Sequence, residues 1–207
     1  MLTLYEEPWS HWCVKARKIM DYKKIKYRAN KVGAYDKREL IEATGQDYVP
    51  ALVEGKQIIT YANIPDYLET MAPVPSIYPN NTRGVAKAIE NWAHYRLEDI
   101  VWQYSVPDMP KTFRDDVERW VFVEMQEIKR GPLEILEACR PKLRAQMEEH
   151  FQILEDMLTE QRFLLGEEAS LGDFAVFGAI SPLLYSGNSL PAEFNRLTAW
   201  HQTIKII

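Results

Sequence analysis

The stretch APVPSIYPNN, residues 72–81, divides the chain into two parts with different folding patterns. It holds three prolines, several polar residues and no hydrophobic periodicity, a composition that predicts a linker. Before it, strand and helix signals alternate at short intervals; after it, strand signals vanish and long amphipathic helical patterns take over. We therefore predict an α/β domain over residues 1–71 and an all-α domain over residues 82–207.

The first part has the pattern of a small mixed sheet covered by helices. Gly55 can supply the positive φ of a tight turn between two strands, and Pro65 is tolerated in the first turn of a helix. Period-2 and short apolar runs predict strands, and period-3.6 runs predict helices. The expected order is strand 2–5, helix 13–23, strand 26–32, helix 36–44, two strands within 49–60 joined at 54–56, and helix 62–71.

The second part is predicted to be helical throughout. A helix over 82–106 is stopped by Pro107 and Pro110, because proline removes a backbone donor and breaks the helix. A second helix is expected over 112–130, and a third after Pro141, ending near residue 160.

A capping signature marks one further helix in this part. In ASLGDFAVFGAI, Ser170 stands three residues before Asp173 and just ahead of an apolar run. The serine hydroxyl can accept from the third helical amide, and the carboxylate favours the positive end of the helix. We assign both residues a structural role.

Composition and charge exclude several classes of function. The net charge is −5 and no dense basic cluster occurs, so we expect neither a nucleic-acid partner nor a membrane surface. Glu6 and Glu7 stand where a secretion signal needs an apolar run, which favours a cytoplasmic protein. The two cysteines, Cys13 and Cys139, have no CxxC or CxxH partner, so neither a zinc site nor a disulfide is expected.

Two features of the first part can carry chemistry together. Ser10 stands at the beginning of a helix, and Val49-Pro50 stands at the beginning of a strand. Proline there costs the sheet a backbone donor, and one reason to keep it is a cis peptide that turns the preceding backbone toward an extended ligand.

Three segments, in the order in which they occur, resemble segments of the glutathione S-transferase superfamily. LYEEPWSHWCVKAR resembles the pattern shared with glutaredoxins: a strand ending in Leu-Tyr, a proline, then Cys-Pro-Tyr-Cys or Ser-Pro-Phe-Cys and a Lys-Ala-Arg-like helix. YVPALVEGK resembles the family's Val-Pro-x-Leu segment, and FLLGEEASLGDFAVFGAI its Leu-x-Gly turn and Ser-x-x-Asp capping box. The resemblance covers most of the chain and implies a thioredoxin-like, glutathione-binding first domain followed by an all-helical one.

The resemblance assigns different roles to the residues of the first helix. Ser10 falls at the position of the attacking cysteine of a glutaredoxin, where a helix N-terminus stabilises an anion. A serine there can donate a hydrogen bond to the glutathione thiolate, although it can also serve only as the helix cap. Cys13 falls at the resolving position and is either redox-active or a packed bystander, and Tyr5 is an alternative thiolate donor.

The expected glutathione site departs from the family pattern at its γ-glutamyl end. Glu-Ser or Asp-Ser commonly precedes the last helix of the first domain, but this chain has Thr60, Tyr61, Ala62 and Asn63, so the amine loses its acidic partner. The γ-glutamyl carboxylate can still bond backbone amides at the helix start and the Thr60 hydroxyl or Asn63 amide. The other expected contacts are the Val49-Pro50 backbone and His11, which replaces the usual proline and either adds a donor or sits exposed. Lys37 or Arg38 is expected at the glycine end, unless both belong only to a solvated helix face.

The second substrate is expected to lie between the two domains. Aromatic side chains from both could form a wall for an apolar electrophile, although packing in the core is the better explanation for each of them taken alone. They are Trp9, Trp12, His94, Tyr95, Trp102 and Tyr104.

Three functions fit these residues. The leading interpretation is a cytoplasmic, homodimeric glutathione transferase of the serine type, with glutathione as co-substrate and a role in detoxification. The alternatives are a glutathione-dependent thiol-disulfide reductase working through Cys13 and a non-catalytic binding module of the same fold.

Overall fold

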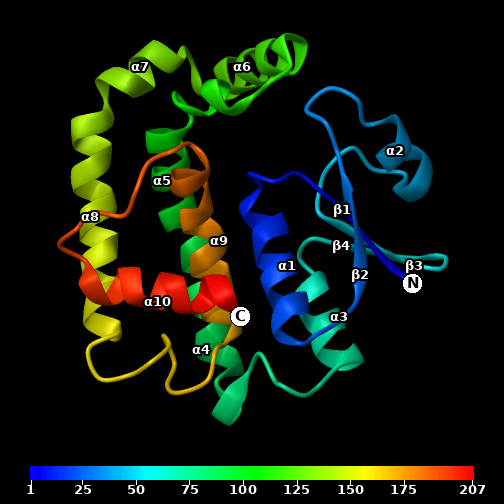
Figure 1. Ribbon diagram of the computed structural model, residues 1–207, viewed down its shortest axis with the longest axis vertical. Helices are drawn as coiled ribbons and strands as arrows, with labels where there is room; N and C mark the ends of the chain where they lie inside the picture. Colours follow the sequence, from blue (N-terminus) through cyan, green and yellow to red (C-terminus); the bar gives the residue numbers. More distant parts are fainter.

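A four-stranded mixed sheet organises the first domain. In the computed structural model, which describes residues 1–207, the strand order is β2-β1-β3-β4 (Figure 1). The central strand β1 (Leu2–Glu6) runs parallel to β2 (Tyr27–Lys31) and antiparallel to β3 (Ala51–Glu54), which pairs with β4 (Gln57–Thr60). The predicted mixed sheet is confirmed.

Three helices accompany the sheet: α1 (His11–Tyr22), α2 (Arg38–Thr44) and α3 (Ile64–Met71). Helix α1 lies between the sheet and the second domain, where it packs against α9 (Leu171–Tyr185) (Figure 1). Because both sides of α1 are covered, its residues are buried well beyond a single apolar stripe. Helix α1 is therefore shared by the cores of the two domains.

The second domain is all-helical, as predicted, and none of its helices is long and apolar enough to cross a membrane. Helix α9 is buried on all sides, which explains the uninterrupted apolar run that encodes it. The remaining helices are α4 (Arg83–Trp92), a π-helical segment (Ala93–Leu97), α5 (Glu98–Ser105), α6 (Asp116–Arg130), α7 (Leu133–Ala138), α8 (Arg140–Met157) and α10 (Asn195–Ile206), with short 3-10 turns at Pro79–Asn81 and Met109–Thr112.

Two predicted helix starts in this domain were wrong, whereas the helix expected over 82–106 is present as a continuous run from Arg83 to Ser105. The expected helix over 82–106 contains a π-helical segment, and the second helix begins at Asp116 because a 3-10 turn precedes it. The third begins at Arg140, since Pro141 occupies a first-turn position that needs no backbone donor. Helix α7 was not predicted at all.

The predicted capping box is present at the N-terminus of α9, and its carboxylate also bonds to residues outside that helix. The Asp173 carboxylate accepts hydrogen bonds from the Ser170 backbone at 2.9 Å, from Leu164 N at 2.9 Å and from Trp200 Nε1 at 2.9 Å. One buried side chain thus connects the start of α9 to the preceding turn and to α10.

A close backbone approach sets the position of α1 on α9. A Cβ atom built on Gly178 of α9 would lie 2.5 Å from the carbonyl oxygen of His11 and 3.4 Å from Lys15 N. Only a residue without a side chain allows this contact, so Gly178 fixes the N-terminal turn of α1 against the second domain.

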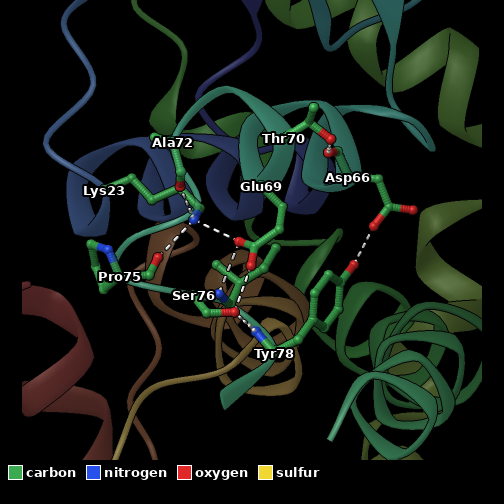
Figure 2. A network of polar contacts seen from close by, with 9 residues as sticks. Lys23, Asp66, Glu69, Thr70, Ala72, Pro75, Ser76 and Tyr78 are labelled. Atoms are coloured by element: carbon green, nitrogen blue, oxygen red, sulfur yellow. Dashed lines mark hydrogen bonds and ion pairs between the residues drawn. The ribbon is translucent and has the colours of Figure 1, made fainter. Parts of the chain in front are cut away.

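A polar network fastens the linker between the domains (Figure 2). Lys23, whose side chain is fully buried, donates to Glu69 Oε2 at 2.6 Å and to the carbonyls of Ala72 and Pro75 at 2.7 Å. Glu69 also accepts from Ile77 N at 3.1 Å. The linker is thereby fixed to the ends of α1 and α3.

The network makes stability depend on pH. Burial disfavours the Glu69 carboxylate, but hydrogen bonds from Lys23, Ser76 and Ile77 outweigh it and hold its pKa below the usual 4.5. The stabilisation is therefore present above pH 4.5 and is lost as pH falls through the lower pKa of the folded state.

We predict that Glu69→Gln reduces the free energy of unfolding at neutral pH by about 1–3 kcal/mol, because buried Lys23 loses its anionic partner. The variant should also lose part of the decline in stability below pH 4.5. Urea denaturation at a series of pH values measures both. The exposed Glu167→Gln is the control, and an equal pH dependence in wild type and Glu69→Gln would contradict the assignment.

We predict that Gly178→Ala destabilises the protein by about 1–3 kcal/mol, because the new methyl group overlaps the His11 carbonyl. Gly84→Ala in α4 is the matched control: nothing lies within 4 Å of its Cβ position, and alanine favours the helix. Thermal unfolding of both variants measures the difference. Equal melting temperatures would show that α1 can shift to accommodate the methyl group without a loss of stability.

Candidate functional site

Ser10 is the N-cap of α1. Its backbone is extended, with φ −69° and ψ 118°, and its Oγ accepts a long hydrogen bond of 3.4 Å from Cys13 N. The hydroxyl is also in side-chain hydrogen-bond contact with the Cys13 thiol. Rotation of the hydroxyl would direct its proton to a ligand while the oxygen still caps the helix.

A pocket of about 260 Å³ lies beside Ser10, between the two domains. Half of its 14 lining residues are hydrophobic, and charged side chains of both signs occupy the remainder together with polar ones. The lining residues are Glu7, Trp9, Ser10, His11, Ala34, Lys37, Tyr48, Val49, Glu98, Trp102, Phe122, Met125, Gln126 and Lys129.

Cys13 lies one turn inside the helix and has no solvent exposure. Burial raises the pKa of its thiol to about 12, although the hydrogen bond with Ser10 opposes the rise. The thiol is thus protonated at neutral pH and does not reach the pocket. Tyr5 is also buried; it packs with Val32 and Leu40 and does not line the pocket beside Ser10.

His11 stands at the edge of the pocket in a chain of polar contacts with the second domain. Its Nε2 lies 2.8 Å from Nδ1 of His94, and its Nδ1 lies 3.2 Å from Oε1 of Glu98. Burial, reinforced by the neighbouring His11, lowers the pKa of His94 to about 4, so this ring is neutral at physiological pH. Both nitrogens of His11 are engaged, which fixes its ring next to Ser10.

A second polar contact crosses the domain boundary one turn further along α1. Lys15 Nζ lies 2.6 Å from Glu90 Oε1, and both side chains are nearly buried. Burial lowers the pKa of Lys15 to about 8 against the opposing effect of Glu90. Together with His11, Lys15 ties the start of α1 to α4 and its π-helical continuation.

The Val49-Pro50 peptide is cis and immediately precedes β3. Val49 lies outside the strand register and lines the pocket. Lys37 lines it too, and its Nζ donates to the Asp47 carbonyl at 2.8 Å and lies 3.8 Å from a Glu7 oxygen. Burial raises the pKa of Glu7 despite the nearby lysine.

The residues expected at the γ-glutamyl end divide into two groups. Tyr61 lines a second hollow of about 440 Å³ with Trp12, and this hollow shares Tyr48 and Val49 with the pocket beside Ser10. The other residues of the turn lie away from the pocket: Ala62 is exposed, and Thr60 and Asn63 face a shallow hollow along β4 and α3.

The expected aromatic wall is only partly assembled. Trp9 and Trp102 are buried in a cluster with Phe113 and Phe122 and line the pocket. His94 contacts His11 and Trp12 instead, since the ring centroids of His94 and Trp12 lie 4.1 Å apart. Tyr95 is exposed, and the ring of Tyr104 lies 5.3 Å from the guanidinium of Arg140; neither lines the pocket.

Several pocket residues escaped the sequence analysis. Glu98 had a usable signal, because it stands four residues after His94 on a predicted helix and therefore on the same face. Glu7 had none. Gln126 and Lys129 belong to α6, whose place over the first domain depends on tertiary contacts such as the 3.1 Å hydrogen bond from Ala34 N to Glu118.

Comparisons with known proteins agree with this architecture. A family model of the glutathione S-transferase N-terminal domain matches residues 4–76, and one of the C-terminal domain matches residues 116–205. No curated protein sequence matches the chain significantly.

Solved structures of similar fold cover nearly the whole chain. A glutathione S-transferase from Rhodospirillum rubrum F11 has a TM-score of 0.77 at 19% identity, covering 99% of this chain and 88% of its own. Glutaredoxin 2 from Salmonella typhimurium, in complex with glutathione, has a TM-score of 0.77 at 21% identity, and the match covers 100% of this chain and 96% of the glutaredoxin. Glutathione transferase GSTFuA3 from Phanerochaete chrysosporium has a TM-score of 0.84 at 16% identity, and the match covers 99% of this chain and 96% of the transferase.

We predict that a thiol reagent modifies only Cys139 in the native protein, because Cys139 is exposed and Cys13 is buried. Cys13 should react only after unfolding, since both its burial and its raised pKa suppress the thiolate. Mass spectrometry after timed labelling measures this, with Cys139→Ser as control. Rapid labelling of native Cys139→Ser would show that Cys13 is accessible.

Proposed function

Because the chain belongs to the glutathione S-transferase superfamily, we propose that it binds glutathione beside Ser10 and presents the thiolate to an electrophilic small molecule. Glutathione is the co-substrate in this reaction. The proposed products are thioether conjugates, formed when the sulfur displaces a leaving group or adds to an activated double bond.

The position of Ser10 carries the proposal. It combines a hydroxyl donor with the N-terminus of α1, and both can stabilise an anion at the edge of the pocket. A second-domain wall of Trp102, Phe122 and Met125 faces the same pocket and can receive the apolar part of an electrophile.

The energies are adequate for a thiolate at neutral pH. Lowering a thiol pKa from about 8.5 by roughly two units requires about 2.7 kcal/mol. A hydrogen bond to a charged group contributes about 1.5–3 kcal/mol, and a helix N-terminus about 0.3–1 kcal/mol. Ser10 and the start of α1 therefore suffice without a separate base.

The residues that hold the remainder of glutathione come from two loops. The backbone of Val49 offers its amide and carbonyl to the cysteinyl portion, in the manner of a short added strand. Lys37 offers a cation to a terminal carboxylate. The proposal includes a cytoplasmic homodimer with a role in detoxification, which rests on the family alone.

The buried thiol argues against the reductase alternative. A disulfide exchange needs a thiolate that reaches its partner, whereas Cys13 has no exposure and a pKa raised to about 12. Calorimetric titration measures glutathione binding, and the absence of heat at millimolar ligand would contradict both the transferase and the reductase interpretations.

We predict that Ser10→Ala lowers kcat/KM for glutathione and an activated aryl halide by roughly 10- to 150-fold at neutral pH, the loss of one charge-assisted hydrogen bond. The pKa of the bound thiol should rise by about one to two units, so the variant regains activity as pH increases. Ultraviolet absorbance of the bound thiolate and the pH profile of the rate measure these changes.

Two variants serve as controls for this prediction. Ser10→Thr keeps the hydroxyl and should retain most of the activity, while Cys13→Ser should leave conjugation unchanged. Loss of the helix cap alone costs about 0.5–2 kcal/mol of stability and does not move a thiol pKa, so a rate loss with an unchanged pKa would refute the role of Ser10.

A further inference from the structure

Three aromatic side chains from three separate segments form an open box next to Val49. Trp12 lies in the first turn of α1, Tyr48 in the loop before β3, and Tyr61 in the turn after β4. The ring centroids of Trp12 and Tyr61 are 4.9 Å apart with planes at 62°, and those of Tyr48 and Tyr61 are 6.0 Å apart at 78°. The rings thus meet at steep angles around one hollow.

The box is accessible and contains no acidic side chain. Tyr48 is 45% exposed and Tyr61 is 38% exposed, which is unusual for adjacent aromatic rings that have no other apolar cover. Only Val49 joins the three rings in lining the hollow. A ligand there would meet aromatic rings rather than a carboxylate.

Aromatic faces of this kind attract cations. The ring quadrupole places negative potential above each face, and boxes of Trp and Tyr are suited to ammonium groups. Trp12 already takes part in such a contact, because Lys15 Nζ lies 3.7 Å from its ring centroid. The Lys15 charge is neutralised by Glu90 at 2.6 Å, so it does not impose a strong positive field on the box.

The box lies next to the pocket beside Ser10. The two hollows share Tyr48 and Val49 as lining residues, so one ligand of extended shape could contact both. Lys37 and Lys129 line only the pocket beside Ser10, together with Glu7 and Glu98. All charged side chains of the two hollows therefore lie at the Ser10 end, and only Val49 and electron-rich rings lie at the other.

This polarity matches the charges of glutathione. Its thiol is central, both of its ends carry a carboxylate, and only the γ-glutamyl end carries an ammonium group. We propose that Trp12, Tyr48 and Tyr61 hold this ammonium group by cation–π contact, with the glycine carboxylate directed toward Lys37. The assignment rests on the proposed function and supplies the amine with a partner that the turn at residues 60–63 otherwise lacks.

The test compares the binding of two ligands by variants that carry substitutions at exposed positions of the box. Tyr48→Leu and Tyr61→Leu remove a ring without disturbing the core, and Tyr61→Phe retains the ring as the matched control. Calorimetry measures the binding of glutathione and of its analogue without the γ-glutamyl amine. Each leucine variant should bind glutathione roughly 3- to 30-fold more weakly, and bind the analogue as the wild type does.

The outcomes separate this assignment from the proposed function. Leucine variants that bind both ligands with equal loss, or with none, would overturn cation–π recognition while leaving glutathione binding intact. A wild-type protein that binds neither ligand would overturn the proposed function and this assignment with it. A selective loss with glutathione, absent in Tyr61→Phe, establishes the box as the ammonium site.

Discussion

The backbone contact between the start of α1 and Gly178 of α9 determines where the candidate site lies. At this point the His11 carbonyl rests against a position that has no side chain, so the N-terminal turn of α1 is pressed onto the second domain. Ser10 precedes that turn directly and therefore opens onto the boundary between the domains. The pocket is a consequence of this packing, because its walls come from both sides of the boundary.

Polar contacts then fix the position of α1 along the helix of the second domain against which it packs. Lys15 pairs with Glu90, and His11 pairs with His94 and Glu98, so successive turns of α1 are matched to successive turns of one helix in the second domain. Sliding α1 by one turn would leave nearly buried charges without partners, which is far more costly than losing an exposed ion pair. The Lys23 network adds a third fixed point at the other end of α1.

Much of the fold could be predicted from local patterns, because strand alternation, helical periodicity and the Ser170 capping box are encoded within a few residues of the features they specify. Ser10 was found for the same reason, since a helix start is a local signal. Helix α7 was not predicted because its six residues are too few to show a helical periodicity. The box of Trp12, Tyr48 and Tyr61 was not predicted because its members come from separate segments that only the folded first domain brings together.

The π-helical segment Ala93–Leu97 has a consequence for how this site could have arisen. A π turn contains one residue more than an α turn, so it is equivalent to a single-residue insertion within an otherwise continuous helix. Removing that residue would rotate everything that follows by roughly 100° relative to α4. Lys15 would keep Glu90, which precedes the segment, but Glu98 would turn away from His11. A change of one codon could therefore add or abolish the acidic partner of His11, together with a rotation of α5 against the helices on which it packs.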